Sequence, residues 1–264
     1  MLKNRNIIVF GASKGIGFAA AKAAVAYGAK VTITARNAER LEAARAELGE
    51  NCFAVACDAT DPTNVKKAVA YAVEKMGTLD GAVNNVGSAD IAPIFALSDE
   101  AYDTTIKACQ YSCMYCMRET SAYMVNNGIK GSIVNTSSLN GHVPYKMYTP
   151  YDAAKGAVNQ MTATACLDLG PYGIRCNAVA PGFTDTDLTA MMNSIPACRE
   201  EILSHTPLGR FATAEEQAEA ICFLLSEKAS FITGVILTVD GGMQHCAYPD
   251  TLPILMAAME QQQR

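Results

Sequence analysis

Short runs of β-branched and other apolar residues alternate with longer, Ala-rich amphipathic segments from residue 6 onward. This alternation is typical of repeated βα units whose strands pair in a parallel sheet. We therefore predict seven strands, at residues 7–10, 31–35, 53–57, 79–85, 131–137, 174–180 and 235–240.

Helices are predicted between these strands because end signals flank the amphipathic segments. Glycine stops several of them, since it readily takes the left-handed conformation that follows a helix. Capping residues or an early proline open others. The predicted helices are Phe18 to Tyr27 before Gly28, Ala38 to Leu48 between Asn37 and Gly49, Pro62 to Gly77, Ser98 to near Gly128, and one opening at the capping box of Thr213 and Glu216.

The whole pattern predicts an α/β fold class: a single Rossmann-type, doubly wound domain whose seven-stranded parallel sheet has helices on both faces. Residues 183–210 lack a regular pattern, and a loop this long in a compact domain is more often functional than idle. The last predicted strand ends at Asp240 and leaves a tail with the apolar run LPILMAAM.

Composition and charge narrow the functional classes. The 264 residues are 50% hydrophobic and 18% charged, which is ordinary for a folded protein. The net charge is −5, and the scattered Lys and Arg offer no basic stripe to nucleic acid. No stretch approaches the roughly 18 apolar residues of a membrane span, and the N-terminal run IIVF is too short for a signal peptide. We expect a cytoplasmic protein without nucleic-acid or membrane partners.

Ten cysteines are many for this length, but their spacing does not suggest a disulfide scaffold. Several lie in apolar segments, where a free thiol behaves as a small hydrophobic group, so a reducing compartment fits best. Cys109, Cys113 and Cys116 recur at helical spacing and include one CxxC. A structural zinc site needs four ligands, and no second pair or nearby His completes this set, so no metal is expected.

A glycine-rich turn, GASKGIG at residues 11–17, follows the first strand and opens a helix. Gly11 allows the tight turn, Gly15 lets the backbone approach a phosphate, and Gly17 lets the helix pack on the strand. Unpaired N–H groups at the helix start attract a pyrophosphate. The position of this motif at the start of the βα series favours a dinucleotide site over a tight turn without a ligand.

Tyr151 and Lys155 lie four residues apart in a helical segment and therefore share a face. An ammonium group beside a phenol is expected to lower a pKa that is normally about 10, which would let Tyr151 transfer a proton near neutral pH. Ser138 follows the fifth strand at the carboxyl edge of the sheet, where open α/β sheets bind ligands. Its hydroxyl could hold a substrate oxygen, although each residue taken alone could be structural.

Together these motifs resemble the short-chain dehydrogenase/reductase family. GASKGIG is followed in order by NNVG at 84–87, Ser138, the YDAAK segment with Tyr151 and Lys155, and NAVAPGFTDT at 177–186, so the resemblance covers residues 6–242. It implies that Ser138, Tyr151 and Lys155 are the catalytic group, with Lys155 also holding the nicotinamide ribose. It implies cofactor contacts from Gly11, Ser13, Lys14, Gly15, Ile16, Gly17, Arg36, Asp58, Ala59, Asn85, Tyr151, Lys155, Pro181, Gly182 and Thr184. Residues 1–242 would form the dinucleotide-binding and catalytic domain, and residues 243–264 a C-terminal tail that acts as an interface or a substrate lid.

The charged residues after the second strand and in the glycine turn indicate whether the cofactor is NAD or NADP. An NAD site usually places a carboxylate after the second strand, whereas the 2′-phosphate of NADP needs a cation. Here Arg36 follows that strand, and Lys14 adds a second cation in the glycine turn. In the family that the chain resembles, basic residues at both places are typical of members that use NADP, so NADP(H) is the expected cofactor. The alternative is that Arg36 and Lys14 are both solvated surface charges. Asp58 resembles the family's adenine contact.

Two positions depart from the family pattern. Phe10 stands where Thr usually precedes the first glycine, and Cys109 stands where the long helix usually carries a catalytic Asn. A thiol is a poor substitute for an amide in holding a proton-relay water. We expect the remaining three groups to work with a different water path.

The predicted activity is NADP-dependent interconversion of a secondary alcohol and a ketone. The missing Asn, the YSCMYCMRET segment and the tail are most similar to bacterial hydroxysteroid dehydrogenases that act on bile acids, with the 12-hydroxyl as the candidate position. The alternatives are a 3-oxoacyl-carrier-protein reductase or other small-ketone reductase, and a non-catalytic NADP-binding regulatory protein. Expected partners are a small-molecule substrate and further copies of the chain, as a tetramer or dimer. Residues that could line an apolar cleft, the core or an interface are Tyr145, Met147, Tyr148, Met191, Met192, Ile195 and Leu252 to Met259.

Overall fold

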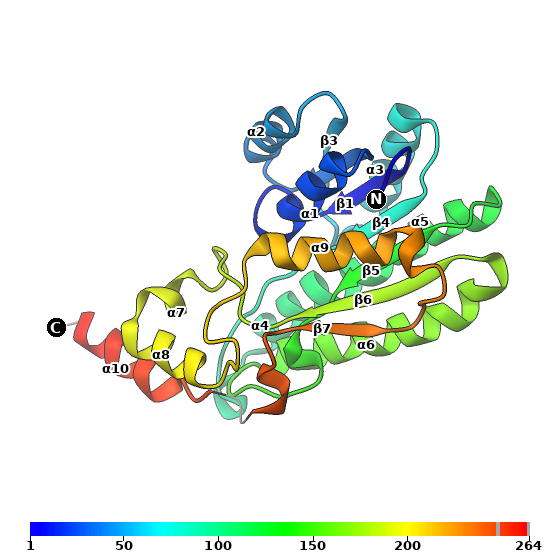
Figure 1. Ribbon diagram of the computed structural model, residues 1–264. Helices are drawn as coiled ribbons and strands as arrows, with labels where there is room; N and C mark the ends of the chain where they lie inside the picture. Colours follow the sequence, from blue (N-terminus) through cyan, green and yellow to red (C-terminus); the bar gives the residue numbers. More distant parts are fainter. Residues whose placement is uncertain (247–248, 263–264) are drawn as a thin grey trace.

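Seven parallel strands form one sheet in the computed structural model, which describes residues 1–246 and 249–262 (Figure 1). The strand order is β3-β2-β1-β4-β5-β6-β7. The chain adds β2 and β3 on one side of β1 and then β4 to β7 on the other side, so the order of the strands switches between β1 and β4. The strands are β1 (Asn6–Phe10), β2 (Lys30–Ala35), β3 (Cys52–Ala56), β4 (Gly81–Asn84), β5 (Ser132–Thr136), β6 (Arg175–Pro181) and β7 (Ile236–Val239).

All seven predicted strands are confirmed, and so is the doubly wound α/β fold class. The fourth strand is shorter than the predicted run 79–85. The carboxylate of Asp80 accepts a hydrogen bond from the backbone N–H of Asn6 at 2.8 Å, and pairing with β1 starts only at Gly81. The backbone N–H of Asp80 also donates to the carbonyl of Asn6 at 2.8 Å, so both the side chain and the backbone of Asp80 hold the start of β1.

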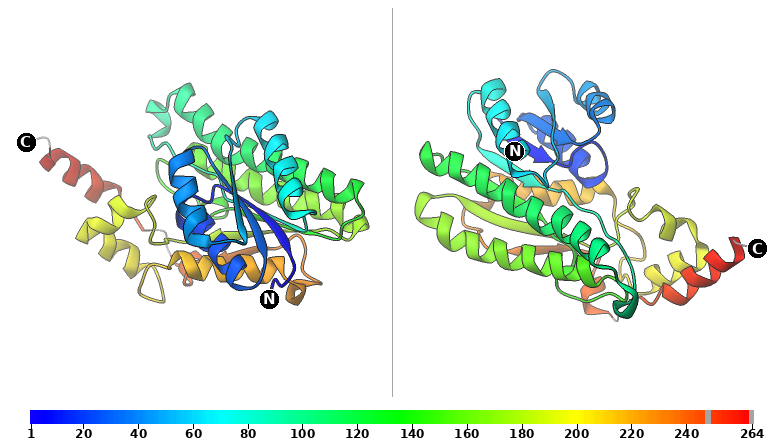
Figure 2. Two further views of the ribbon diagram at one scale, coloured as in Figure 1. Left: turned by 90° about the horizontal axis from the view of Figure 1, so that it is seen from above. Right: turned by 180° about the vertical axis from the view of Figure 1, so that it is seen from behind.

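Helices cover both faces of the sheet (Figures 1 and 2). One face is covered by α1 (Gly15–Ala26), α2 (Ala38–Leu48) and α9 (Ala214–Leu225), whose apolar residues form one core cluster with β1 and β2. The other face is covered by α3 (Pro62–Met76), α5 (Ser112–Asn126) and α6 (Thr149–Leu169), which contribute to a second cluster. Helices on both faces leave the carboxyl edge of the strands as the place where polar side chains can gather.

The long helix predicted from Ser98 to near Gly128 is interrupted. Ser98 caps α4 (Asp99–Ile106) as expected, but a π-helical turn at Lys107–Tyr111 separates it from α5. Such a turn inserts an extra residue into the helical ladder and is common at functional sites. Cys109 lies within it.

Residues 183–210 were expected to be irregular, and this is wrong in part. They contain α7 (Ala190–Ser194) and α8 (Pro196–Ser204), the latter opened by a proline. Met192, Cys198 and Ile202 from these helices are buried in a third cluster away from the sheet. Short 3₁₀ turns lie at Ile94–Ala96, Leu139–Gly141, Gly170–Tyr172, Glu227–Ala229 and Met243–His245.

The C-terminal tail forms α10 (Leu252–Gln262), which lies beside α8 at one side of the molecule (Figures 1 and 2). Leu255 is buried in the third cluster with Tyr145 and Met192. The tail therefore packs at the end of the molecule that carries the predicted substrate segments. Residues 247–248 and 263–264 of the predicted tail, and the side chain of Met259, lie outside the described residues.

Three observations concern membrane-spanning helices, metal ligands and disulfide bonds. Among residues 1–246 and 249–262, no helix is long and apolar enough to cross a bilayer. In the same part of the chain, no group of three or more His, Cys, Asp or Glu side chains could hold a metal ion. All ten cysteines are free thiols.

Candidate active site

The residues predicted to bind cofactor and substrate gather at the carboxyl edge of the sheet. Gly11 follows β1, Asn85 follows β4, Ser138 comes after β5, and Pro181 ends β6. The strand order reverses between β1 and β4, and open α/β sheets bind ligands at such a switch point. The topology thus brings together residues that are far apart in the sequence.

The glycine turn is closely packed. Gly11 has a φ of +74°, which favours glycine, and its N–H donates to the carbonyl of Thr34 at 3.0 Å. A Cβ at Gly17 would lie 2.3 Å from the carbonyl oxygen of Gly11, so no larger residue fits there. Asn85 Nδ2 donates to the same carbonyl at 3.1 Å. Asn85, predicted as a cofactor contact, therefore also holds the turn.

The start of α1 fits a pyrophosphate. Lys14 is the N-cap and its side chain makes no capping hydrogen bond, whereas the side chains of Asn37 and Asp61 cap α2 and α3. The N–H groups of the first turn of α1 thus have no side-chain acceptor from the cap. A Cβ at Gly15 would meet only the side chain of Thr186, at 3.7 Å. An uncapped helix start beside a glycine turn suits a phosphate ligand.

The other predicted cofactor residues follow β1, β2 and β3. Arg36 is exposed directly after β2 and forms no ion pair within the described part of the chain. Asp58 follows β3, and its Oδ1 accepts hydrogen bonds from the backbone N–H and the hydroxyl of Thr60, at 3.0 and 2.8 Å. The other three positions are partly or fully buried: Ser13 in the glycine turn, Ile16 against the core beneath α1, and Ala59 beside Asp58.

The three predicted catalytic residues meet at one point. Lys155 Nζ donates to the carbonyl of Thr136 at 2.7 Å and lies 5.5 Å from the ring centre of Tyr151. The hydroxyl of Ser138 lies close enough to the phenol of Tyr151 to favour the phenolate and so to act on its pKa. The four-residue spacing within α6 places Tyr151 beside Lys155, and the segment that follows β5 brings Ser138 to the same place.

Burial raises the pKa of Tyr151 and outweighs the lowering effects of the Lys155 charge and of the Ser138 hydroxyl. The expected net lowering of this pKa is therefore wrong. The physical reason is that a phenolate at this position would lose its hydration. Burial also opposes the charge of Lys155, but its neighbours Tyr151, Cys109 and Cys113 more than compensate, so its pKa is raised and the ammonium stays charged.

Cys109 lies beside this group, in the π-helical turn. Its Sγ donates to the carbonyl of Ser88 at 3.1 Å, and the side chain is 1% exposed. A Cβ at Gly87 would lie 3.3 Å from this sulfur and 3.8 Å from Lys155 Nζ. The thiol therefore packs against the loop that follows β4 and holds part of it in place.

Residues of the loop after β6 contact two different parts of the molecule. A Cβ at Gly182 would lie 2.7 Å from the Cα of Asp240, and the hydroxyl of Thr184 accepts a hydrogen bond from Gln217 of α9 at 3.3 Å. Thr186 and Asp187 instead face the glycine turn: Thr186 approaches Gly15, and Asp187 pairs with Lys14. Neither was predicted as a site residue, because only the fold brings this loop over the turn.

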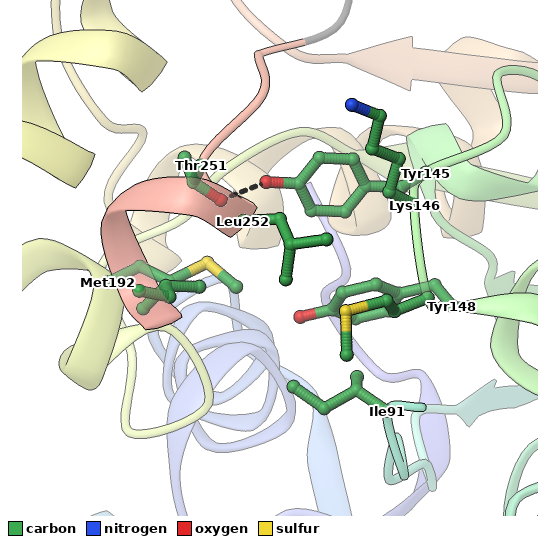
Figure 3. A pocket seen from close by; sticks show the side chains of 9 residues that line it. Ile91, Tyr145, Lys146, Tyr148, Met192, Thr251 and Leu252 are labelled. Atoms are coloured by element: carbon green, nitrogen blue, oxygen red, sulfur yellow. Dashed lines mark hydrogen bonds between the residues drawn. The ribbon is translucent and has the colours of Figure 1, made fainter. Parts of the chain in front are cut away.

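An apolar pocket is lined by Tyr148, which is a neighbour of Tyr151 (Figure 3). Tyr145 and Tyr148 have ring centres 5.1 Å apart, and Tyr148 meets the ring of Tyr151 edge-on at 6.1 Å. Figure 3 shows Ile91, Met192 and Leu252 converging on the same hollow, and the hydroxyls of Tyr145 and Thr251 are hydrogen-bonded. The hollow encloses about 270 Å³, a volume that includes space open to solvent. Several predicted cleft residues, from the loop after β5, α7 and the tail, are thus brought together.

Comparison with known proteins identifies the family. A family model described as enoyl-(acyl carrier protein) reductase matches residues 11–244. The chain belongs to the short-chain dehydrogenase/reductase family. This short-chain dehydrogenase/reductase is an oxidoreductase that acts on secondary alcohols with a nicotinamide cofactor, in agreement with the arrangement above.

Individual relatives are similar over nearly their whole length. The chain is 38% identical over 247 residues to the A-factor type γ-butyrolactone 1′-reductase (1S-forming) of Streptomyces virginiae, covering 92% of this chain and 96% of that protein. It is 38% identical over 242 residues to the cis-4-hydroxycyclohexanecarboxylate dehydrogenase of Sinomonas cyclohexanicum, covering 90% and 96%. A structure of a short-chain type dehydrogenase/reductase from Mycobacterium ulcerans matches with a TM-score of 0.93 and 31% identity, covering 97% of this chain and 95% of that one.

Proposed function

We propose that this protein is an NADP(H)-dependent enzyme that interconverts a secondary alcohol and a ketone on an apolar ring substrate. The observation that carries the proposal is the row of Tyr145, Tyr148 and Tyr151, which leads from the apolar pocket to the phenol beside Lys155. The exposed cation after β2 supports the choice of cofactor.

Each residue of the proposed catalytic group has a distinct task. In the direction of reduction, the phenol of Tyr151 donates its proton to the ketone oxygen, and in oxidation the phenolate takes the proton of the alcohol. Ser138 donates a hydrogen bond to the same oxygen. Lys155, fixed by Thr136, keeps a positive charge next to the phenol, which limits the cost of the phenolate. The nicotinamide ring, when bound, supplies or accepts the hydride.

Charge at the adenosine end supports NADP(H). Arg36 stands at the position where an NAD site usually carries a carboxylate, and it has no ion-pair partner among residues 1–246 and 249–262 that would neutralise it. An arginine suits a phosphate because its planar group donates several hydrogen bonds at once. Lys14 reinforces the charge from the glycine turn.

The pocket lining supports an apolar ring. Most of its side chains are aliphatic, aromatic or sulfur-containing, and two of its polar groups are already engaged: Tyr145 with Thr251, and Lys146 with Asp250. A polyhydroxylated sugar would leave hydroxyls without partners here, which is costly in a closed site. The name of the Sinomonas relative, a hydroxycyclohexane dehydrogenase, agrees with a ring alcohol.

Among ring alcohols, the proposal includes polycyclic substrates such as hydroxysteroids, and bile acids oxidised at the 12-hydroxyl in particular. The hollow is open to solvent on one side, so part of a steroid would extend beyond it. Exposed apolar side chains continue along the segments that form the pocket: Ile94 and Phe95 after Ile91, Met191 on α7, and Met256 on α10.

A matched substrate panel tests the proposal through the absorbance of the reduced nicotinamide. Its arms are a substituted cyclohexanone, 3-, 7- and 12-oxo bile acids, an aldose and a 3-oxoacyl thioester, each with NADPH and NADH. We expect turnover with ring ketones and NADPH. Faster turnover of the aldose or the thioester would overturn the substrate part, and a preference for NADH would overturn the cofactor part. NADPH binding without turnover of any arm would favour the regulatory alternative.

The acyl-thioester arm matters because the matched family model is described as an acyl-carrier-protein reductase. The carrier is acidic, and a reductase that binds it presents basic residues. Ile129 and Tyr172 stand at the corresponding positions here, and the chain has a net charge of −5. The homo-oligomeric state and cytoplasmic location stay predictions, for which sedimentation and cell fractionation are the measurements.

A further inference from the structure

One half-buried carboxylate next to the proposed catalytic group has no task in the mechanism above. Asp152 follows Tyr151 in the first turn of α6 and is only partly exposed. Its Oδ1 accepts a hydrogen bond from Asn140 Nδ2 at 2.7 Å, and its Oδ2 accepts one from the backbone N–H of Tyr145 at 2.9 Å. The two oxygens thus hold two points of the loop that follows β5.

The first contact leads to Ser138. The backbone N–H of Asn140 donates to Ser138 Oγ at 3.2 Å, and Ser138 Oγ donates to Asn140 Oδ1 at 3.3 Å. An ionised carboxylate can only accept hydrogen bonds, so Asp152 selects the orientation of the Asn140 amide with nitrogen toward itself. The amide oxygen consequently faces Ser138 and accepts a hydrogen bond from its hydroxyl, while the backbone N–H of Asn140 donates to the same Oγ. The two contacts fix the position of the Ser138 Oγ, from which the hydroxyl turns to the substrate oxygen when substrate binds.

The second contact leads to the pocket. Tyr145 is buried, and its ring is part of the tyrosine row that ends at Tyr151. Met147, two residues later, has a φ of +69°, so this loop takes a conformation that an L-residue adopts only when its surroundings impose it. The bond from Tyr145 to Asp152 is one of the contacts that fix the loop on α6.

We propose that Asp152 is a positioning residue that acts through Asn140 on the hydroxyl of Ser138 and through Tyr145 on the wall of the substrate pocket. One carboxylate thereby couples the alignment of the reacting oxygen to the shape of the cleft. The inference rests on the proposed catalytic role of Ser138. It adds no proton-transfer step, because the hydrogen bonds of the Asp152 carboxylate within the described residues lead to Asn140 and Tyr145 and not to the Tyr151 phenol.

The test compares steady-state kinetics, NADPH affinity and melting temperature in the full-length protein. Asp152→Asn keeps the shape but allows either end of the Asn140 amide to face it. We expect kcat to fall about 10- to 100-fold, as for a displaced catalytic group, with NADPH affinity unchanged. Asp168→Asn, at the exposed far end of the same helix, is the matched control and should match wild type.

A second variant separates this role from a purely structural one. Asn140→Ala breaks the link to Ser138 but leaves the bond between Asp152 and Tyr145, and it should lower kcat to a similar extent. In Asp152→Asn the remaining amide oxygen can still accept from the Tyr145 N–H, so if Asp152 acts on Ser138 through Asn140, the double variant will be no slower than Asn140→Ala alone. Independent, multiplying losses would overturn the relay, and a wild-type kcat in Asp152→Asn would overturn the whole inference.

Failure of the proposed function can be distinguished from failure of the Asp152 inference. If the proposed function is wrong, the wild-type protein will prefer another substrate or NADH in the panel. The kcat of each variant is then measured with that preferred substrate and cofactor. Should Asp152→Asn not fold, Asn140→Ala still decides the relay, because its loss of kcat at unchanged NADPH affinity is required by the inference.

Discussion

Lys14 and Asp187 form an ion pair, with Nζ and Oδ2 2.7 Å apart, that joins the glycine turn to the loop after β6. Lys14 is one of the two cations proposed to bind the 2′-phosphate of NADP. The carboxylate therefore lies where it competes with that phosphate for the same ammonium group, and the pair links cofactor binding to the position of the loop.

The first prediction concerns this competition. Asp187→Asn should tighten NADPH binding and leave NADH binding unchanged, because Lys14 is released for the phosphate. Both side chains are more than half exposed, so the gain should be less than about fivefold, in line with a surface ion pair of up to about 1 kcal/mol. Fluorescence titration with the two cofactors measures it, and equal changes for both would contradict the competition.

The second prediction concerns Arg36. Arg36→Ala and Lys14→Ala should each weaken NADPH binding while sparing NADH, with the larger loss expected for Arg36 because no carboxylate of the described residues pairs with it. The same titration gives the result. Lys67→Ala, on the exposed side of α3, is the control for a general loss of positive charge.

The third prediction concerns the proton donor. Tyr151→Phe should reduce turnover by at least about 100-fold and leave NADPH affinity nearly intact, whereas Lys155→Ala should impair both. Single-turnover kinetics and cofactor titration separate the two effects. Near-normal turnover in Tyr151→Phe would remove Tyr151 from its proposed role.

The fourth prediction follows from the raised pKa of Tyr151. Reduction needs the protonated phenol, so its rate should stay level through neutral pH and fall as pH rises through the pKa. Oxidation needs the phenolate, so its rate should increase over the same alkaline range. Rate profiles in both directions check the sign, and an oxidation rate that is already level below neutral pH would mean that burial does not dominate.

The fifth prediction uses two glycines with opposite surroundings. Gly17→Ala should destabilise the fold and abolish cofactor binding, because its methyl group would lie 2.3 Å from a backbone oxygen that cannot move away. Gly156→Ala, in α6 with no heavy atom within 4 Å of the added carbon, should stabilise the protein by roughly 0.5–1 kcal/mol through the helix backbone. Chemical denaturation measures both, and similar changes would refute the packing argument.

A sixth comparison addresses the departure at Cys109. Cys109→Ser keeps a donor for the carbonyl of Ser88 and should change turnover only a few-fold. A loss on the order of 100-fold at unchanged folding and NADPH affinity would mean that the thiol has a catalytic task.

The sequence by itself determined what depends on neighbours along the chain. Apolar periodicity fixes the strands and helices, the glycine spacing fixes the turn into α1, and the four-residue spacing places Tyr151 beside Lys155, because these features follow from local backbone geometry. The order of motifs was enough to indicate the family.

Only the tertiary structure decided what depends on distant segments. The pairing of Lys14 with Asp187, the contacts of Asp152, and the pocket between the loop after β5 and α10 join residues that no local pattern relates. The π-helical turn at Cys109 likewise interrupts a helix that local propensity would continue. The direction of the Tyr151 pKa has the same origin: the spacing supplies the neighbouring charge, but the fold removes the water, and here the loss of hydration has the larger effect.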